Sequence, residues 1–404
     1  MLAATYRGFR RALRVVTRPV RRDRGLKGVV IQPYRGYGTP DEAFLPGRVF
    51  RQPRFGAGLP AGTLRRQLAD ALRRLVRWGL GGVRITAELG TARATVETDS
   101  DGYFRITLPL AGNPNPDRLW HDVALTATWA DVHVRETGRV FIPPASARFV
   151  VISDIDDTVM HTGVANKLLM MWRLFVQGAE SRTAFPGVSA LYRALHGGVG
   201  NGELNPMLYV SRGPWSIYEV LERFFQIQEI PVGPILFLRE WGLTLQRPLP
   251  KRAEDHKRDL IRGILERYDT LPFILIGDSG QHDPEIYAGV VAEHPGRVLA
   301  VYIRNVSPGD ARRGEIDALA RRTAEADCPL VLASDSRTMA EHAAAEGWIS
   351  RDAVEEVARE RRAEVEEPER PSRPEPLTVS AERAEEAARS GPDHEAPPDV
   401  VVEG

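Results

Sequence analysis

The sequence predicts an α/β protein whose main domain holds a mostly parallel sheet, preceded by a small all-β, sandwich-like domain and followed by a disordered tail. Three observations support this fold class. Short alternating segments fill residues 29–145, strand and helix patterns alternate from residue 148 onward, and the end of the chain is rich in Pro, Glu and Ala. Alternating strands and helices are typical of a parallel sheet, whereas a segment poor in apolar residues cannot form a core.

Composition limits the class of protein. At 404 residues the chain is long enough for two domains, each with its own core. Lys plus Arg and Asp plus Glu number 54 each, so the net charge indicates no partner and we expect no nucleic-acid binding. The single cysteine, Cys328, excludes an internal disulfide framework. No apolar run reaches the roughly 18–20 residues that cross a bilayer, so we expect a cytoplasmic protein that could lie peripherally at the inner face of the membrane.

Residues 1–28 form a basic amphipathic N-terminal segment, with nine Arg or Lys and one Asp. Apolar residues in this segment recur at alternating spacings of three and four, which predicts one apolar helix face: Tyr6, Phe9, Leu13, Val16 and Val20. Such a helix could lie on an anionic membrane surface. It could equally pack on its own protein and leave a solvated basic face, and the sequence leaves both interpretations open.

Residues 29–145 predict an all-β accessory domain. Strand patterns lie at 28–38, 46–50, 83–89, 92–98, 103–108, 123–129 and 132–142, and a helix is predicted over 63–78. Short alternating strands at this spacing indicate an antiparallel sandwich or barrel. No group here has catalytic spacing, and we interpret His121 and His133 as ordinary strand-edge residues.

Residues 148–350 predict the α/β domain, and residues 351–404 predict a helix followed by an acidic disordered tail. The expected strands are 148–153, 206–211, 234–238, 272–277, 297–303 and 328–332. The expected helices are 164–177, 187–196, 214–228, 253–268, 283–293, 309–325, 335–346 and 350–366. The insert between Thr158 and Met207 is too short for a large cap domain. Its apolar run 168–176 fits a core helix, and the alternative is a surface that dips into lipid beside the site.

Two of the predicted strands end in acids. One ends at Asp154 and Asp156, and another ends at Asp278, with Asp283 five residues further along. Unpaired buried charges are costly, and ligands of open α/β sheets bind beyond the carboxyl ends of the strands. We therefore expect these acids to converge on one divalent cation, and an all-oxygen ligand set favours Mg²⁺.

Two further positions suit phosphate binding. Ser211 ends a predicted strand just before Arg212 and Pro214, and the start of the next helix leaves backbone N–H groups free to hold phosphate oxygens. Lys257 lies in the first part of a later helix and could neutralise a phosphate. Each signal is weak when it is taken alone.

Taken together and in order, these motifs resemble the haloacid dehalogenase (HAD) superfamily. Asp154-Ile155-Asp156-Asp157-Thr158 resembles its nucleophile motif, and Ser211, Lys257 and the stretch 277–283 match the second, third and fourth motifs. The fuller sequences Tyr-Val-Ser-x-x-Pro-Trp and Ile-Gly-Asp-Ser-Gly-Gln-x-Asp-Pro-Glu-Ile-Tyr resemble phosphatidate phosphatases of the actin-patch-protein type, which are chemically related to the lipins. The resemblance covers roughly residues 148–305 and implies a HAD-like Rossmannoid domain.

The resemblance implies catalytic and metal-binding roles. Asp154 would be the nucleophile and form an aspartyl-phosphate. Asp156 would protonate the leaving oxygen and then activate the hydrolytic water. Mg²⁺ would sit on the Asp154 carboxylate, the Asp156 backbone carbonyl and Asp278, while Asp283 would support the metal shell or Lys257.

The resemblance also implies a phosphate-binding set. Ser211 and Lys257 would hold the phosphoryl oxygens where negative charge develops. Thr158 belongs to the same set and would steady the loop around Asp154. Arg212 stands where a small polar residue is expected, and it could contact an anionic headgroup or form a salt bridge.

We therefore predict a Mg²⁺-dependent phosphatase acting on a phosphomonoester, with hydrolysis of phosphatidate to diacylglycerol as the leading reaction. One alternative is a phosphatase for a soluble or nucleic-acid terminal phosphate. Another is a lipid-binding module with a vestigial phosphatase domain, although the presence of both Asp154 and Asp156 argues against it. The sequence indicates neither the oligomeric state nor the role of the all-β domain.

Overall fold

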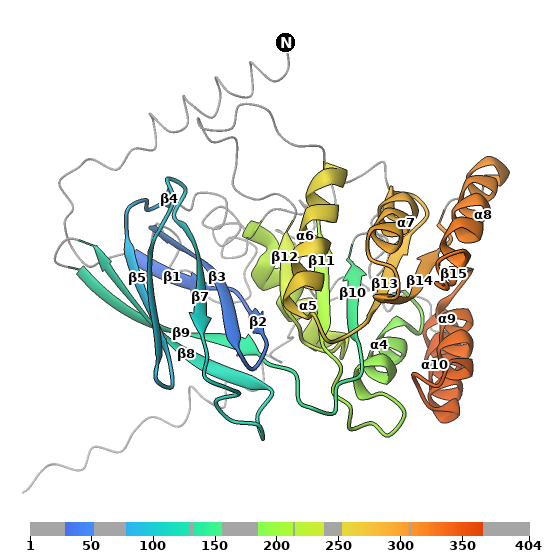
Figure 1. Cartoon of the computed structure of the whole chain (residues 1–404), viewed down its shortest axis with the longest axis horizontal. Coiled ribbons are helices and arrows are strands. Elements are labelled where there is room, and N and C mark those ends of the chain that lie inside the picture. Colours follow the sequence, from blue (N-terminus) through green and yellow to red (C-terminus); the bar gives the residue numbers. More distant parts are fainter. Residues whose placement is uncertain are drawn as a thin grey trace, which may run out of the picture. The chain divides into compact units, whose positions relative to one another are not determined.

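The computed structural model describes residues 29–51, 78–129, 132–155, 185–212, 215–237, 253–306 and 309–366 (Figure 1). These residues form two sheets, one of nine strands and one of six. The described residues all fall within one compact unit, Met1–Glu366.

The first sheet is formed by strands from the N-terminal part of the chain. Its strands are β1 (Val29–Pro33), β2 (Gly36–Gly38), β3 (Glu42–Arg51), β4 (Trp78–Gly79), β5 (Arg84–Leu89), β6 (Ala92–Glu97), β7 (Tyr103–Pro109), β8 (Trp120–Trp129) and β9 (Val132–Phe141). The order is β1-β3-β2-β9-β8-β5-β6, and both β4 and β7 pair with β3. The pairings are antiparallel except for β2 with β9.

Alternation explains why these segments form one-sided strands. In β5 and β7, buried residues such as Ile85, Ala87, Ile106 and Leu108 alternate with more exposed ones, as expected when one face of an antiparallel sheet covers a core. Trp78, which was predicted to end a helix, instead begins β4. The rest of that predicted helix lies outside the described residues.

The second sheet is entirely parallel. Its strands are β10 (Val150–Asp154), β11 (Met207–Ser211), β12 (Ile235–Phe237), β13 (Phe273–Asp278), β14 (Val298–Arg304) and β15 (Leu330–Ala333). They are ordered β12-β11-β10-β13-β14-β15. The predicted α/β class with a parallel sheet is therefore confirmed, and the strand that ends at Asp154 lies between β11 and β13.

Helices cover both faces of the parallel sheet (Figure 1). They are α4 (Val188–Gly197), the short helix η3 (Trp215–Ile217), α5 (Tyr218–Ile227), α6 (Ala253–Arg267), α7 (Asp283–Glu293), α8 (Asp310–Ala324), α9 (Ser336–Ala345) and α10 (Arg351–Glu366). Helices α4, α5, α9 and α10 pack with Val151 and Ile274, whereas α6, α7 and α8 pack with Ile152 and Leu275. Strands buried on both faces need continuous apolar runs, which is the pattern that predicted them.

Helix α10 belongs to this helical layer. Glu364 and Glu360 of α10 accept hydrogen bonds from the backbone N–H groups of Gly187 and Ala190, at 2.7 and 2.8 Å. Gly187 is the N-cap of α4 and offers no side-chain oxygen of its own. Carboxylates from another helix thus satisfy N–H groups that α4 leaves unpaired at its start.

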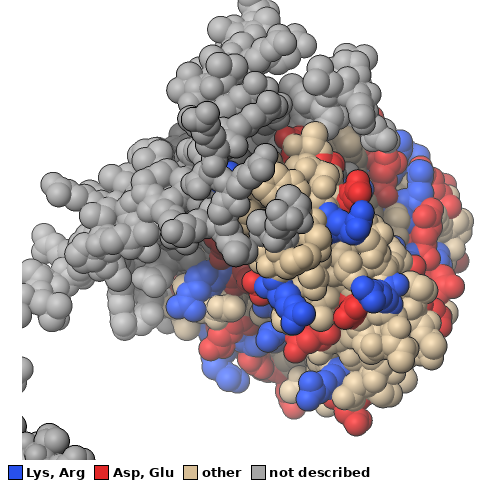
Figure 2. All heavy atoms as spheres, turned by 90° about the vertical axis from the view of Figure 1, so that its left-hand side faces the viewer, with Lys and Arg blue, Asp and Glu red and all other residues tan. Residues whose placement is uncertain are grey.

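Several sequence predictions concern residues outside the described ranges. They include the basic segment 1–28, the helix 164–177 with its apolar run 168–176, and the tail beyond residue 366. Within the described ranges, none of the helices has the length and apolar character required to cross a membrane. Among the described residues of the face in Figure 2, basic and acidic side chains are intermixed rather than gathered by sign.

Candidate active site

Three acids and one lysine meet at the carboxyl edge of the parallel sheet. Asp154 is the last residue of β10 and Asp278 the last residue of β13. These two strands are neighbours in register, with Ser153 opposite Ile276, so their ends lie side by side. Asp283 begins α7, and carboxylate oxygens of the three acids lie within 4.8 Å of one another. All three side chains are completely buried.

Lys257 bridges two of the acids. Its ammonium donates hydrogen bonds to Asp154 Oδ1 at 2.7 Å and to Asp283 Oδ1 at 2.5 Å. Burial alone would lower the pKa of Lys257, but the nearby carboxylates of Asp154 and Asp283 outweigh burial and raise this pKa above its ordinary value. Lys257 therefore stays protonated, and its charge is paired with two buried carboxylates.

The balance of charge in this cluster fits a divalent cation. Among the described side chains of the cluster, three carboxylates face one ammonium group. An excess of buried negative charge is unfavourable unless a cation compensates for it. All the acidic ligand atoms are oxygens, which suits a hard cation such as Mg²⁺ or Ca²⁺. The donor set therefore fits a divalent metal.

The loop after β13 orients the Asp278 carboxylate. Oδ1 accepts the backbone N–H of Gly280 at 2.7 Å, and Oδ2 accepts the side-chain amide of Gln281 at 2.8 Å. Both oxygens are thereby fixed in direction, as expected for a metal ligand held by its surroundings. The sequence motif contained Gln281, but its spacing gave no sign of this contact.

Gly277 allows Asp283 to reach the cluster. A Cβ atom at residue 277 would overlap the Asp283 carboxylate and lie 2.8 Å from a ring carbon of Tyr287. Asp283 Oδ2 also accepts the backbone N–H of Asp278, at 3.3 Å. The absence of a side chain at residue 277 is thus what brings the start of α7 against the end of β13.

Behind Asp154 lies a pair of buried hydroxyl groups. Ser153 Oγ donates to the backbone carbonyl of Asp154 at 2.8 Å and lies 2.5 Å from the Tyr192 hydroxyl in α4. Because the single Ser153 proton is directed at the carbonyl, Tyr192 is the donor of the second bond. Burial raises the pKa of Tyr192 to about 12, so this phenol keeps its proton. Sequence reasoning missed Tyr192, which lies within the helix predicted over 187–196 and was not singled out.

The structure places the expected phosphate-binding residues at the same edge. Ser211 is buried at the end of β11, one residue beyond Val210, which pairs with Asp154. Arg212 follows it and is partly buried. Asp156 and Thr158, which the sequence also assigned to the site, lie outside the described residues.

The histidines considered in the sequence analysis lie in the first sheet. His121 is on β8 and His133 is on β9, where its ring contacts Thr128. Burial lowers the pKa of His121. Neither residue belongs to the acidic cluster.

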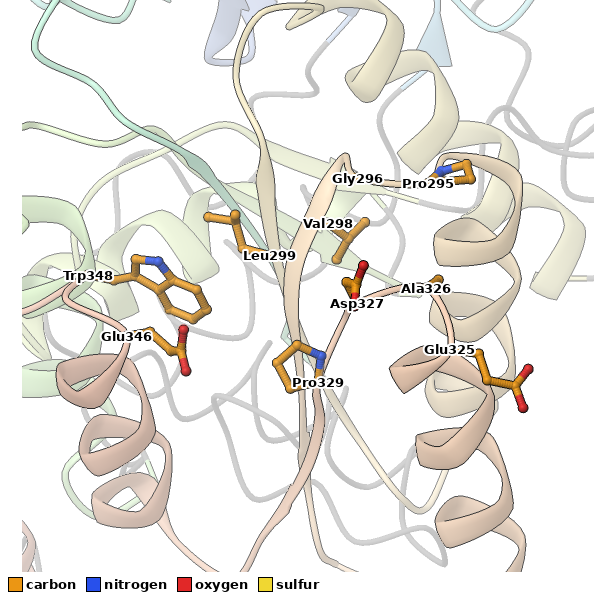
Figure 3. Close-up of a pocket in the computed structure, with 10 residues that line it drawn as sticks. All are labelled: Pro295, Gly296, Val298, Leu299, Glu325, Ala326, Asp327, Pro329, Glu346 and Trp348. Carbon is orange, nitrogen blue, oxygen red and sulfur yellow. The ribbon is translucent and has the colours of Figure 1, made fainter.

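A cavity of about 750 Å³ lies at the amino ends of the parallel strands, on the side of the sheet opposite to the strand ends that carry the acids (Figure 3). Val298 and Pro329 line it, at the amino ends of β14 and β15. The acidic cluster lies where the strands end, so this cavity is separate from the candidate active site.

Comparison with known proteins supports the resemblance read from the motifs. Residues 149–305 match the family described as "Phosphatidate phosphatase APP1, catalytic domain". The chain is 34% identical over 155 residues to Phosphatidate phosphatase APP1 of Saccharomyces cerevisiae. This alignment covers 38% of this chain and 25% of that protein. It is 29% identical over 219 residues to an uncharacterized protein of Schizosaccharomyces pombe, and this alignment covers 53% of this chain and 35% of that protein. The resemblance to this type of catalytic domain is confirmed over the matched residues.

These matches concern only part of each protein. The chain spans about a quarter to a third of the length of the curated relatives. Among solved structures, a carbohydrate acetylesterase from Xanthomonas citri aligns at 11% identity over 72% of each chain, with a TM-score of 0.24. A likeness this low carries no argument about fold or function.

Proposed function

We propose that this chain is a Mg²⁺-dependent phosphatase that hydrolyses phosphatidate to diacylglycerol and inorganic phosphate. The observation that carries the proposal is the buried cluster of Asp154, Lys257, Asp278 and Asp283 at the ends of two parallel strands and the starts of two helices. A carboxylate nucleophile, a fixed ammonium group and a cation-binding set are what transfer of a phosphoryl group to an aspartate requires.

In the proposed reaction, an Asp154 carboxylate oxygen attacks phosphorus and forms an aspartyl-phosphate. The bond between phosphorus and the diacylglycerol oxygen breaks, and Asp156 gives that oxygen its proton. Asp156 then takes a proton from water as the water oxygen attacks the phosphorus of the aspartyl-phosphate. This step releases inorganic phosphate and regenerates Asp154. The role of Asp156 is supported by the motif resemblance.

Charge at the site is handled by the neighbouring residues. Mg²⁺ held by Asp154 and Asp278 would offset the repulsion between an anionic nucleophile and an anionic phosphate. Lys257 contacts Asp154 directly, so its ammonium lies where a phosphoryl oxygen would approach the nucleophile. Asp283 holds Lys257 in that position. Ser211, at the next strand end, is proposed to bind another phosphoryl oxygen.

The lipid substrate is supported by the curated relative named as a phosphatidate phosphatase. A phosphate on a membrane lipid must be reached from the water side, because the acyl chains stay in the bilayer. We therefore also propose that the basic segment 1–28 contacts anionic membrane, since clustered Lys and Arg are attracted to anionic lipid.

The first prediction concerns the nucleophile. Wild-type protein with Mg²⁺ should release phosphate from phosphatidate vesicles, and Asp154→Asn should lower the rate at least ~10³-fold because an amide oxygen is a poor nucleophile. Asp317→Asn removes an exposed acid of α8 and is the matched control. Phosphate release is measured by a colorimetric assay, and circular dichroism checks that each variant folds.

Other outcomes would redirect or remove the proposal. Turnover of a soluble phosphomonoester with none of vesicle phosphatidate would keep the phosphatase and remove the lipid substrate. Vesicle binding without phosphate release from any ester would favour the lipid-binding module. Vesicle binding that survives deletion of residues 1–28 would remove the membrane role of that segment.

A further inference from the structure

Tyr34, in the connection between β1 and β2, is buried among residues of the α/β domain. Its side chain is only 2% exposed and belongs to the same apolar cluster as Phe149 and Val151. The Tyr34 ring centroid lies 4.0 Å from that of Trp215 and 4.7 Å from that of Tyr218. A residue that connects two strands of the first sheet thus completes the apolar core beside the second sheet.

Trp215 stands close to the proposed phosphate-binding residues. It begins η3, and only three residues separate it from Ser211 at the end of β11. Trp215 is 5% exposed and packs on Phe237 of β12, with centroids 4.8 Å apart. Phe237 is also the residue that pairs with Ser211 across β11 and β12, so the position of the Trp215 ring bears directly on the strand ends that hold Ser211.

Polar contacts hold the same connection against the start of α5. The backbone N–H of Arg35 donates to the Tyr218 hydroxyl at 2.9 Å, and Arg35 Nε donates to Glu222 at 2.6 Å. The Gln32 amide donates to Glu219 at 2.9 Å. These hydrogen bonds fix the backbone beside Tyr34 relative to α5. The Tyr34 ring is therefore held against Trp215 by polar contacts as well as by apolar packing.

We propose that Tyr34 is a positioning residue for phosphate binding, and that one role of the all-β domain is to hold Trp215 so that Ser211 and Arg212 face the phosphoryl oxygens. The inference rests on the proposed function of Ser211. Precise placement matters because hydrogen-bond donors stabilise a developing charge only when they are held in position beforehand.

Tyr37 supplies a matched control within the same domain. It is also an almost buried tyrosine, 6% exposed, but its ring lies 6.2 Å from that of Tyr268, beyond the last turn of α6. The Arg267 guanidinium lies 5.5 Å above the Tyr37 ring. Lys257 is near the opposite end of α6. Loss of Tyr37 should therefore remove a similar amount of buried surface without releasing Trp215.

The experiment measures how the full-length chain binds inorganic phosphate in the presence of Mg²⁺. Phosphate is titrated as a competitive inhibitor of turnover and, independently, as a ligand that raises the melting temperature. Tyr34→Ala should weaken phosphate binding about tenfold, as expected for loss of a well-packed aromatic contact. Tyr34→Phe, which keeps the ring, should stay within about twofold of wild type, as should Tyr37→Ala.

Three outcomes would overturn the proposal: equal weakening in Tyr34→Ala and Tyr37→Ala, no weakening in Tyr34→Ala, or no phosphate binding by the wild type. If Tyr34→Ala does not fold, Tyr34→Leu is used and the same comparison with Tyr37→Ala decides. The melting-temperature titration needs no turnover. Wild type that binds phosphate but hydrolyses no ester would remove the proposed reaction while leaving the positioning role testable.

Discussion

At the scale of single residues, each acid of the candidate site lies at the boundary of an element: Asp154 and Asp278 end strands, and Asp283 begins α7. Asp154 and Asp278 follow apolar strands, and parallel strands end at one edge of their sheet. Tyr192 and Gln281 were not predictable, because a hydroxyl or amide shows its partner only when distant segments are brought together. Sequence spacing within one element therefore located the charges but not the groups that orient them.

A prediction at this scale concerns Gly277. Gly277→Ala should lower turnover at least about tenfold, because the new Cβ would overlap the Asp283 carboxylate and displace it from Lys257. The position of Asp283 is set by backbone that is already packed, so the overlap cannot be relieved cheaply. Steady-state phosphate release measures the effect.

Gly289→Ala is the matched control for Gly277→Ala. Gly289 lies in α7, and a Cβ there would meet nothing within 4 Å. Because this Cβ meets no neighbour, alanine at residue 289 should stabilise the helix by up to about 1 kcal/mol relative to glycine. Equal turnover in the two variants would show that Gly277 is not required for the approach of Asp283.

At the scale of elements, strand and helix positions agreed closely with the sequence. Helices α6, α7 and α8 begin and end within about one residue of the predicted ranges. In α7 the boundary is marked by Asp283 and by Pro284 in the first helical turn, which is a typical helix start. The exception, Trp78, belongs to β4, which has only two residues. So short a strand is defined by its pairing with Phe50 and Arg51 of β3, and no local pattern indicates such a partner.

The contact between α4 and β10 gives a prediction at the element scale. Tyr192→Phe should lower the free energy of unfolding by about 1–2 kcal/mol, because Ser153 Oγ would lose its buried donor. Ser153→Ala should have a cost of its own. The double variant should cost less than the sum by about 0.5–1.5 kcal/mol, since both changes remove the same bond.

Urea denaturation of the four proteins measures this coupling energy. The four proteins must have equal m-values, so that their denatured states are comparable. Strictly additive losses would mean that the two hydroxyl groups do not act as a unit. In that case Tyr192 would stabilise α4 without supporting the backbone of Asp154.

At the scale of the whole molecule, the sequence separated an all-β part from an α/β part but could not say how they cooperate. The hydrogen bond between Arg35 and Tyr218 joins residues 183 positions apart. Periodicity describes which face of an element is apolar, and it does not identify which distant element covers that face. The contact between the Tyr34 and Trp215 rings could therefore be found only from the structure.

Metal binding and global stability should be coupled through the acidic cluster. Under the proposed function Mg²⁺ would bind the folded site and not the unfolded chain, so at a concentration of 100 times Kd it should add about 2.7 kcal/mol to the free energy of unfolding. For a domain of this size such a gain raises Tm by about 5–10 °C. Asp278→Asn should abolish this rise in Tm, because a neutral amide replaces the carboxylate that would bind the metal. Gly280 and Gln281 already orient that carboxylate.

The same variant tests whether the buried acids repel one another without metal. Lys257 pairs with Asp154 and Asp283, and carboxylate oxygens of these two acids lie within 4.8 Å of a carboxylate oxygen of Asp278. In metal-free buffer, Asp278→Asn should therefore melt at or above the wild-type temperature, although it loses one charged hydrogen-bond acceptor. Calorimetry with and without Mg²⁺ at constant ionic strength measures both effects, with Asp317→Asn as the control. If the metal-free variant melts well below wild type, the Asp278 carboxylate itself stabilises the fold. The cluster would then need no cation to balance its charge.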